Sequence, residues 1–223
     1  MRTRHVYDRQ AETYDTTRGA SPSVLGPLQD ALKGAPGREL LDIGGGTGNY
    51  AVALQAKGWD PLVIDLNPAM LARAAAKGLR ILQADAAALP VANAVADAVI
   101  LISMLHHVPD WRSALEEARR VLRSGGRLAL MCWTREHMER VTWLREYFPS
   151  MNDWLALDHA SLAELQSELP GARFCEWISA MSRTHLSARS SAGRVSCWIP
   201  IGAARLPTSR SSNRDFPRSS KSA

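Results

Sequence analysis

Three aspartates follow three successive apolar segments of this chain, and a run of glycines follows the first of them. Asp42 lies within Leu-Leu-Asp-Ile-Gly-Gly-Gly-Thr-Gly-Asn, Asp65 follows Pro-Leu-Val-Ile, and Asp85 follows Leu-Arg-Ile-Leu-Gln-Ala. This spacing predicts that the three carboxylates meet at the carboxyl edge of one parallel sheet, where open α/β sheets bind ligands. Gly44 and Gly46 would let the backbone approach such a ligand closely and adopt positive φ angles.

Phosphate-binding motifs fit this segment poorly. A dinucleotide fingerprint counted from Gly44 places Asn49 at its third glycine, and a P-loop needs a lysine, whereas none lies between Lys33 and Lys57. An acidic rim also repels polyphosphate and suits a ligand with hydroxyls, an amine and a sulfonium charge. An NAD-dependent oxidoreductase is therefore the less favoured alternative.

The elements that position these residues alternate between strand-like and helix-like segments. We expect strands at 39–43, 62–65, 79–83, 96–103 and 127–133, and helices at 25–32, 47–57, from Pro68 onward and at 111–123, with a turn at Gly125-Gly126. This alternation predicts an α/β fold, a doubly wound, Rossmann-like, mostly parallel sheet with helices on both faces. Further along the chain, 174–178 and 194–201 offer weaker strand-like patterns, so a C-terminal β-hairpin built from them would be incomplete.

The glycine-rich segment resembles the first motif of class I S-adenosylmethionine-dependent methyltransferases. The resemblance runs in consistent order over residues 5–133. It includes an amino-terminal segment that closes over the cofactor, the second-strand acid, the adenine-site segment, the fourth strand with its loop, and the helix and turn before the fifth strand. These segments lie at 7–18, 64–71, 83–90, 97–110 and 117–128.

The resemblance implies S-adenosylmethionine as the cofactor and S-adenosylhomocysteine as its product. Asp65 would accept hydrogen bonds from both ribose hydroxyls, although helix N-capping is its alternative role. Gly44 and Gly46 would approach the methionine portion. Asp42 would anchor the loop and reach the amino group of the ligand, directly or through water.

The adenine and methyl ends are assigned by the same resemblance. Asp85 would accept from the exocyclic amine of adenine, and Ala86 would offer its backbone N–H to the ring. Leu66 and Met70 would pack on ribose and base, or alternatively fill the core. Ser103 would contact the amino-acid end of the cofactor near its methyl group.

The remaining implied residues close the site. Tyr14 and Arg18 would form a lid, with Arg18 pairing the cofactor carboxylate. His107 is the candidate general base, because histidine titrates near neutral pH; methyl transfer to an amine or phenolate does not require one. We expect no metal site, because the adjacent His106 and His107 should point apart. The implied cofactor-binding residues are Tyr14, Arg18, Asp42, Gly44, Gly46, Asp65, Leu66, Met70, Asp85, Ala86 and Ser103.

The chain divides into three parts by composition. Residues 1–34 are expected to be a helical lid, and 35–178 a methyltransferase domain with a substrate-side insertion at 135–170. The Ser/Arg-rich residues 179–223 hold eight basic residues against Asp215 alone, while the other 178 residues carry a net charge of −2. This tail is disordered, a basic interaction arm, or an out-of-frame translation; the three readings stay open.

Composition also bounds the setting and the partners. The start of the chain lacks a signal peptide pattern, and Cys132, Cys175 and Cys197 have neither disulfide nor zinc spacing. We therefore expect a cytoplasmic monomer or homodimer that methylates a small molecule at oxygen, nitrogen or carbon and binds neither nucleic acid nor membrane. The alternative is a module that binds the cofactor but has lost turnover, because an incomplete hairpin would leave a sheet edge open.

Overall fold

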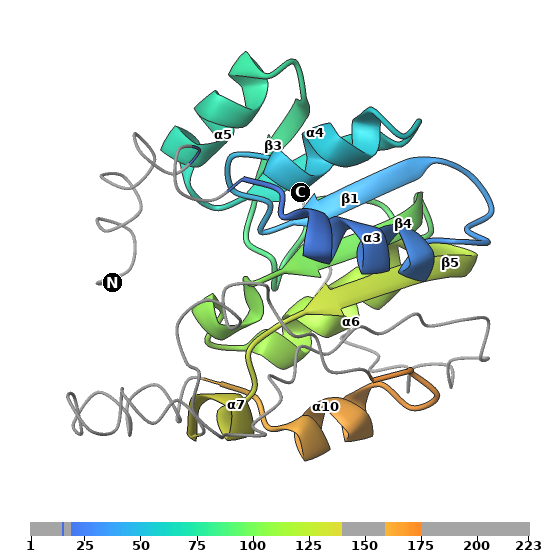
Figure 1. The fold of residues 1–223 in the computed structure, drawn as a ribbon, viewed down its shortest axis with the longest axis vertical. Coiled ribbons are helices and arrows are strands. Elements are labelled where there is room, and N and C mark those ends of the chain that lie inside the picture. Colours follow the sequence, from blue (N-terminus) through green and yellow to red (C-terminus); the bar gives the residue numbers. More distant parts are fainter. Residues whose placement is uncertain (1–14, 16–18, 140–158, 175–223) are drawn as a thin grey trace, which may run out of the picture.

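The computed structural model describes Asp15, residues 19–139 and residues 159–174. The grey segments in Figure 1 are the remainder of the chain. Tyr14, Arg18, the tail 179–223 and both strand candidates for the closing hairpin beyond Phe174 lie outside the described residues. The predictions made for them stay predictions.

A five-stranded parallel sheet forms the centre of the described structure (Figure 1). The strands run in the order β3-β2-β1-β4-β5, and every neighbouring pair is parallel. The order reverses between β1 and β4, so the crevice at the carboxyl ends of these two strands is the topological switch point of a doubly wound sheet. The strands are β1 (Glu39–Ile43), β2 (Asp60–Asp65), β3 (Arg80–Gln83), β4 (Ala96–Ile102) and β5 (Leu122–Met131).

Helices connect the strands and cover both faces of the sheet, as the sequence predicts. On one face, Leu28 of α3 packs with Leu40 of β1 and Ala98 of β4, and α4 and α5 extend this layer over β2. On the other face, Leu115 of α6 packs with Val99 of β4. The helices are α3 (Pro22–Ala31), α4 (Asn49–Gln55), α5 (Pro68–Ala76), α6 (Trp111–Val121), α7 (Arg135–Glu139) and α10 (Leu162–Glu168), with a 3-10 turn η1 (Leu105–His107).

The apolar run of β4 explains its central position. Its residues Ala96 to Leu101 are all buried, which is typical of a parallel strand covered on both faces. Each fully buried leucine or isoleucine in such a strand contributes about 2 kcal/mol of transfer free energy. This rigid centre fixes the loops that leave its carboxyl end.

The predicted boundaries hold to within a few residues except around β5. The expected turn at Gly125-Gly126 lies inside this strand, which begins at Leu122. Pairing jumps from Ala96↔Leu122 to Ala98↔Arg127, so the intervening residues form an irregularity in the ladder. Gly125 allows it with a φ of 78°. Sequence reasoning took a bulge within the strand for the turn that precedes it.

Candidate cofactor and active site

The glycine loop after β1 turns tightly because its backbone is tied to the neighbouring strand. The amides of Gly44 and Gly45 both donate to the carbonyl oxygen of Ile64, at 2.7 and 3.2 Å. Gly44 has a φ of 68°, and a Cβ there would lie 2.7 Å from the Cβ of Met104. A Cβ at Gly46, in contrast, would meet no atom within 4 Å. The loop is therefore packed on its inner side and open at Gly46, where a ligand can approach the backbone.

Asp65 at the end of β2 organises this loop. Its Oδ2 accepts a hydrogen bond from the Gly46 amide at 2.9 Å, and its Oδ1 accepts one from the Asn67 amide at 2.8 Å. Burial raises the pKa of Asp65 more than these backbone hydrogen bonds lower it. Each carboxylate oxygen keeps a further lone pair, so the group still has the capacity to accept two hydroxyl donors.

Helix N-capping, the alternative role for Asp65, is performed by Asn67, two residues later. Asn67 is the N-cap of α5, and its side chain accepts hydrogen bonds from the amides of Ala69 and Met70. Pro68 occupies the first helical position, where a missing N–H costs nothing. Asp65 is thus free of the capping role and points its carboxylate to the glycine loop.

Asp42 lies beneath the glycine loop and is 2% exposed. A Cβ on Gly45 would lie 2.6 Å from its carboxyl carbon, so the loop backbone rests directly on this carboxylate. Its Oδ2 accepts no hydrogen bond from any described residue. Burial, together with the charge of Asp65, raises the pKa of Asp42 to about 7. The site therefore holds a buried acid that titrates near neutrality.

The residues predicted to hold ribose and adenine come after β2 and β3: Leu66 follows β2, Met70 lies in α5, and Asp85 and Ala86 follow β3. Leu66 is 42% exposed, whereas Met70 is buried at 3%, which suits core packing as well as ligand contact. Ala86 packs into the core, and the exposed Asp85 accepts a hydrogen bond from the Ala87 amide at 2.9 Å. Leu66, Asp85 and Ala86 thus follow the carboxyl ends of the neighbouring strands β2 and β3, and their roles toward a ligand stay predictions.

The loop that follows these residues is clamped from α6. Glu117 accepts a hydrogen bond from the Leu89 amide at 2.7 Å. Arg120 pairs with Glu117 and donates to the carbonyl oxygens of Leu89 and Val91. This ion pair, which sequence analysis did not single out, holds the predicted adenine segment against the sheet.

Ser103 follows β4 and has an unusual backbone. Its φ is 53°, a left-handed value that is uncommon for a residue with a side chain. Its amide donates to the carbonyl oxygen of Met131 at 2.7 Å, which ties the end of β4 to the end of β5. Such strained positions gather at functional sites, and this one lies across the crevice from the glycine loop.

Three histidines lie together beyond Ser103. The rings of His106 and His107 are 3.9 Å apart and tilted by 54°, so the expectation that they point apart is wrong. The reason is that both lie in η1, a tight turn, instead of an extended loop. His106 also stacks on the buried His159, with ring centroids 4.9 Å apart and planes 10° from parallel. His107 is the exposed member of this group.

Comparisons with known proteins agree with this geometry. A family model described as a methyltransferase domain matches residues 41–130. A ubiquinone/menaquinone biosynthesis C-methyltransferase from a Caulobacter strain is 31% identical over 180 residues, covering 70% of this chain and 71% of that protein. The chain belongs to the class I S-adenosylmethionine-dependent methyltransferases. This membership sets aside the oxidoreductase alternative.

Two further similarities define what the methyltransferase shares with its relatives. An uncharacterised methyltransferase from Mycobacterium tuberculosis is 40% identical over 127 residues, covering 56% of this chain and 51% of that protein. The methyltransferase thus aligns with about half the length of these Mycobacterium relatives. The crystal structure of a SAM-dependent methyltransferase from Thermotoga maritima matches with a TM-score of 0.61 at 22% identity, covering 87% of this chain and 91% of that one, which shows the shared fold.

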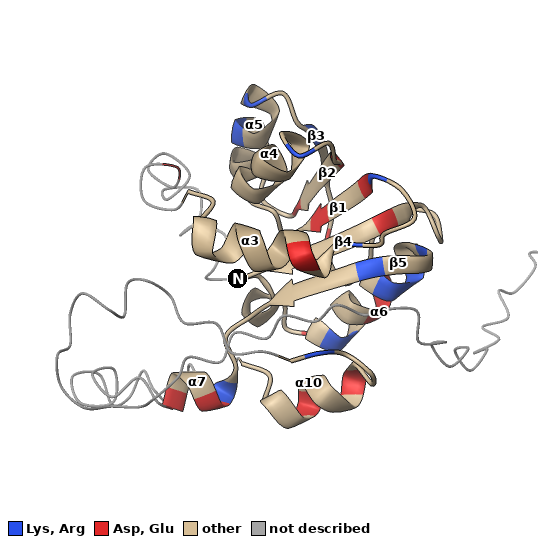
Figure 2. Ribbon diagram, turned by 45° about the vertical axis from the view of Figure 1, so that its right-hand side comes forward, with Lys and Arg blue, Asp and Glu red and all other residues tan. Residues whose placement is uncertain are grey.

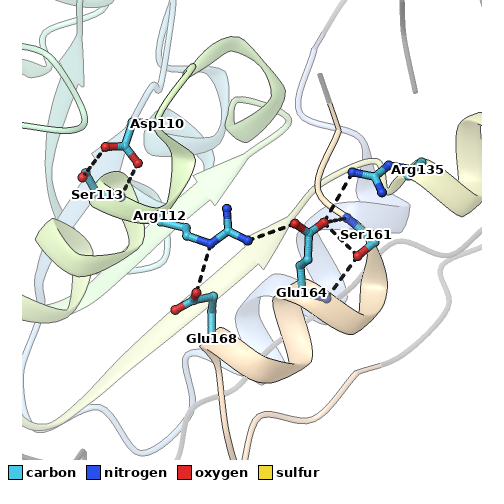
Figure 3. Close-up of polar contacts among 7 residues, drawn as sticks. All are labelled: Asp110, Arg112, Ser113, Arg135, Ser161, Glu164 and Glu168. Atoms are coloured by element: carbon cyan, nitrogen blue, oxygen red, sulfur yellow. Dashed lines mark hydrogen bonds and ion pairs between the residues drawn. The ribbon is translucent and has the colours of Figure 1, made fainter. Parts of the chain in front are cut away.

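Ion pairs and hydrogen bonds connect α6, α7 and α10 (Figure 3). Arg112 of α6 contacts Glu164 and Glu168 of α10 at 2.9 and 3.1 Å, and Arg135 of α7 lies 3.5 Å from Glu164. Hydrogen bonds from Ser161, which forms a capping box with Glu164, and from Arg112 lower the pKa of Glu164 to about 2. Glu164 is therefore charged at any working pH and holds the three helices together.

An aromatic pair lies at the end of β5. Trp133 is 42% exposed, and its ring meets that of His137 edge to face at 4.9 Å. His137 and His159 are themselves buried. In Asp15, residues 19–139 and 159–174, no group of three or more His, Cys, Asp or Glu side chains is arranged to hold a metal ion. None of the helices in this part of the methyltransferase is long and apolar enough to cross a membrane.

Sequence reasoning missed one contact that reaches the glycine loop. Asp15 accepts a hydrogen bond from Thr47 at 2.6 Å and forms an ion pair with Lys77 at 2.9 Å. The available signal was the position of Asp15 inside the segment that resembles the family's lid. Its partners Thr47 and Lys77 lie 32 and 62 residues further along the chain, and no pattern near them in the sequence indicates the contact.

Proposed function

We propose that this methyltransferase moves a methyl group from S-adenosylmethionine to a small-molecule acceptor, and that the switch-point crevice holds both. The observation that carries the proposal is the Asp65 carboxylate. It binds the Gly46 amide on one side and retains acceptor capacity on the other, next to open space above Gly46. An uncharged ribose with two neighbouring hydroxyls fits that arrangement. Its hydroxyls would donate to a charged carboxylate, and such charge-assisted hydrogen bonds are about twice as strong as neutral ones.

The chain offers a partner for each part of the cofactor. We assign the ribose to Asp65 and Leu66, the adenine to Asp85, Ala86 and Met70, and the methionine portion to Gly44, Gly46 and Ser103. The buried Asp42, with its unpaired oxygen and its pKa of about 7, supplies negative charge below the loop for an ammonium group. Tyr14 and Arg18 remain the proposed lid residues.

The reaction needs positioning more than proton transfer. S-adenosylmethionine, when bound, would supply a methyl group on a positively charged sulfur; an electron pair of the acceptor would form the new bond to the methyl carbon, and the carbon–sulfur bonding pair would stay on sulfur. Well-oriented reactants gain an effective molarity of 10⁵ M or more, on the order seen in intramolecular reactions. His107, exposed beside Ser103 on the same edge, is the proposed proton acceptor when the attacking atom carries a proton.

We infer that the acceptor is a flat aromatic or quinone-type molecule. The support is the aromatic character of the segments after two neighbouring strands, with the exposed Trp133 after β5 and the His106 stack after β4, because aromatic rings pack favourably on flat π systems. The printed name of the Caulobacter relative, a ubiquinone/menaquinone biosynthesis C-methyltransferase, points to the same class. A carbon nucleophile on a reduced quinone ring would lose its proton after the bond to methyl forms, which gives His107 a role.

Calorimetric titration with S-adenosylhomocysteine tests the proposal. Asp65→Ala should abolish micromolar binding, whereas Asp60→Ala, at the exposed opposite end of the same strand, should leave it unchanged. Asp65→Asn, which keeps one acceptor oxygen, separates loss of charge from collapse of the loop, and a thermal melt of each protein confirms folding. A folded wild-type protein that binds no S-adenosylhomocysteine would contradict the proposal.

Turnover separates the acceptor classes. A reduced naphthoquinone, an amine and a carboxylate are offered with S-adenosylmethionine, and methylation of the quinone alone is the expected result. His107→Gln should then slow turnover by about tenfold with unchanged binding of S-adenosylhomocysteine. Methylation of the amine in preference to the quinone would overturn the acceptor assignment.

A further inference from the structure

Lys77 lies at the end of α5 and reaches back over the glycine loop. It is the C-cap residue of that helix, where a positive charge is favourable next to the carbonyl end of the helix dipole. Its ammonium donates to the Thr47 carbonyl oxygen at 2.8 Å and to Asn49 Oδ1 at 2.7 Å, and it pairs with Asp15 Oδ2 at 2.9 Å. An ammonium has three N–H donors, so every one of them is used.

Two side chains of opposite charge thus hold the backbone of two consecutive loop residues, Gly46 and Thr47. The Asp65 carboxylate takes the amide N–H of Gly46, and the Lys77 ammonium takes the carbonyl of Thr47, the next residue. This matters because glycine-rich backbone loses more conformational freedom on ordering than any other, at about 1–2 kcal/mol per residue. A loop that is ordered before the ligand arrives binds it more tightly.

Asp15 joins this arrangement from the amino-terminal segment. One of its oxygens accepts from the Thr47 hydroxyl at 2.6 Å while the other faces Lys77. Burial alone would raise the pKa of Asp15, but hydrogen bonds from Thr47, Lys77 and Asn49 outweigh it and leave the pKa below its usual value. The side chains of Lys77 and Asp15 are 25% and 31% exposed, so water and salt screen the pair only in part.

We propose that Lys77 is a positioning residue for cofactor binding: it fixes the glycine loop in its ligand-facing form and couples that form to Asp15, without touching the cofactor. This inference rests on the proposed function of the crevice. It assigns an effect on affinity to Lys77 and Asp15, neither of which is among the proposed cofactor contacts. Since the pair acts before chemistry, it changes the binding of the cofactor and leaves the chemical step alone.

The test is a double-mutant cycle with Lys77→Met and Asp15→Asn. Lys77→Met keeps the length of the stem and removes all three donors, so it should raise the Kd for S-adenosylhomocysteine and the KM for S-adenosylmethionine about tenfold, with kcat within about twofold. Asp15→Asn should raise the Kd about threefold. The double variant should match Lys77→Met, because the charge of Asp15 acts through its ion pair with Lys77, whereas an asparagine amide oxygen can still accept the Thr47 hydrogen bond.

Two further variants sharpen the result. Lys77→Arg keeps the charge but presents a planar fork that cannot reach three acceptors spread around one nitrogen, so an intermediate loss is expected. Lys33→Met is the matched control, since Lys33 forms an exposed ion pair with Asp30 at 2.7 Å far from the loop. A Kd for Lys77→Met equal to that of the wild type, or additive effects of the two substitutions, would overturn the proposal.

Amide hydrogen exchange provides a readout that needs no ligand. In the free protein, Lys77→Met should speed exchange at residues 46–49 about tenfold, with residues 96–102 of the central strand unchanged. Unchanged exchange at 46–49 would refute the role of Lys77 even if wild-type binding of S-adenosylhomocysteine failed. Absence of binding in the wild-type protein, with faster exchange in the variant, would instead refute the proposed function and leave the positioning of the loop established.

Discussion

Two buried aspartates on neighbouring strands lie toward opposite ends of the sheet and have opposite surroundings. Asp97 near the amino end of β4 accepts a hydrogen bond from the Glu39 amide at 2.9 Å and pairs with Arg123 at 2.9 Å. Asp42 near the carboxyl end of β1 is at least as buried, yet one of its oxygens has no hydrogen-bond partner among the described residues. An aspartate carboxylate therefore has its hydrogen-bond partners at the amino end of the sheet. At the carboxyl end, the buried carboxylate has an oxygen without one among the described residues, which costs free energy in the folded state.

The pKa values follow this contrast. Burial raises the pKa of Asp97, but the hydrogen bonds from Arg123 and Glu39 and the charge of Arg123 outweigh it, so the pKa lies below its usual value. For Asp42, burial and the charge of Asp65 act in the same direction and raise the pKa to about 7. In Figure 2, red and blue segments alternate across the amino ends of β1, β4 and β5, where opposite charges pair. At the amino end the charged groups stabilise one another, whereas at the carboxyl end Asp42 keeps an oxygen without a partner among the described residues, which suits the ligand site proposed there.

Glycine substitutions at the two ends should give the largest effects and separate the two roles. Gly44→Ala introduces a Cβ 2.7 Å from that of Met104 at a φ of 68°, so the loop must move. Because forcing the loop into its ligand-facing form against this overlap costs about 1–3 kcal/mol, we expect affinity for S-adenosylhomocysteine to fall by about 10- to 100-fold in calorimetry. Gly58→Ala is the matched control, because Gly58 has a φ of 87° with open space around it. That substitution introduces the backbone strain of a positive φ without a steric overlap.

Gly37→Ala is the counterpart at the amino end. Its methyl group would collide with the Asp97 carboxylate and displace it from Arg123. Urea unfolding should show a loss of about 1–3 kcal/mol, the usual cost of an unsatisfied buried group, while the folded protein binds S-adenosylhomocysteine normally. Equal loss of affinity in Gly37→Ala and Gly44→Ala would break the division between the ends.

The pH dependence of stability should differ in sign between the two aspartates. Asp42 has a folded pKa of about 7 against an ordinary value of 3.8, so the folded state binds more protons between these values. The stability that Asp42 contributes is fully present below about pH 4 and is lost as the pH rises through about 7. The free energy of unfolding should therefore fall by about 2–3 kcal/mol between pH 5 and 8. Asp42→Asn should remove that slope in urea unfolding at the two pH values.

Asp97→Asn provides the opposite case. Because its folded pKa is lowered, Asp97 stabilises the protein above its ordinary pKa and loses that effect only as the pH falls through the folded value. The substitution should therefore reduce stability by a similar amount at pH 5 and pH 8 and leave the slope of the wild type in place. A slope that persists in Asp42→Asn would show that another group titrates near neutrality.

The comparison also explains how much the sequence could reveal. Periodicity and spacing predicted the parallel sheet, and glycines with an acid one β-α unit later predicted the edge where Asp65 and Gly46 meet, because those signals are local. Asp97 looked like an ordinary member of an apolar strand, since its partner Arg123 is 26 residues away. The stack of His106 on His159 spans an even larger separation.

Contacts of this second kind depend on tertiary packing, which has no period in the sequence. Lys77 reads as a helix-end lysine until α5 is packed beside the glycine loop, and only then do its three acceptors surround it. Likewise, the depth of Asp42 beneath Gly45 follows from the turn of the loop and not from residue type. The sequence therefore predicts the strands, the helices and the glycine-rich edge of the sheet better than the long-range contacts that hold their side chains in place.

The exposed charges at the amino end should give the smallest effect. Arg80 at the start of β3 pairs with Glu39 and Asp60, the first residues of β1 and β2, at 3.1 and 2.9 Å. All three side chains are about half exposed, so solvent screens the network and we expect Arg80→Met, which keeps much of the aliphatic stem, to cost less than about 1 kcal/mol. Urea unfolding should lose even this difference in 1 M salt, where the Debye length is about 3 Å. A cost that survives in salt would mean that Arg80 acts through the packing of its stem, and that stability at the amino end is carried by more than the ion pair of the buried Asp97 with Arg123.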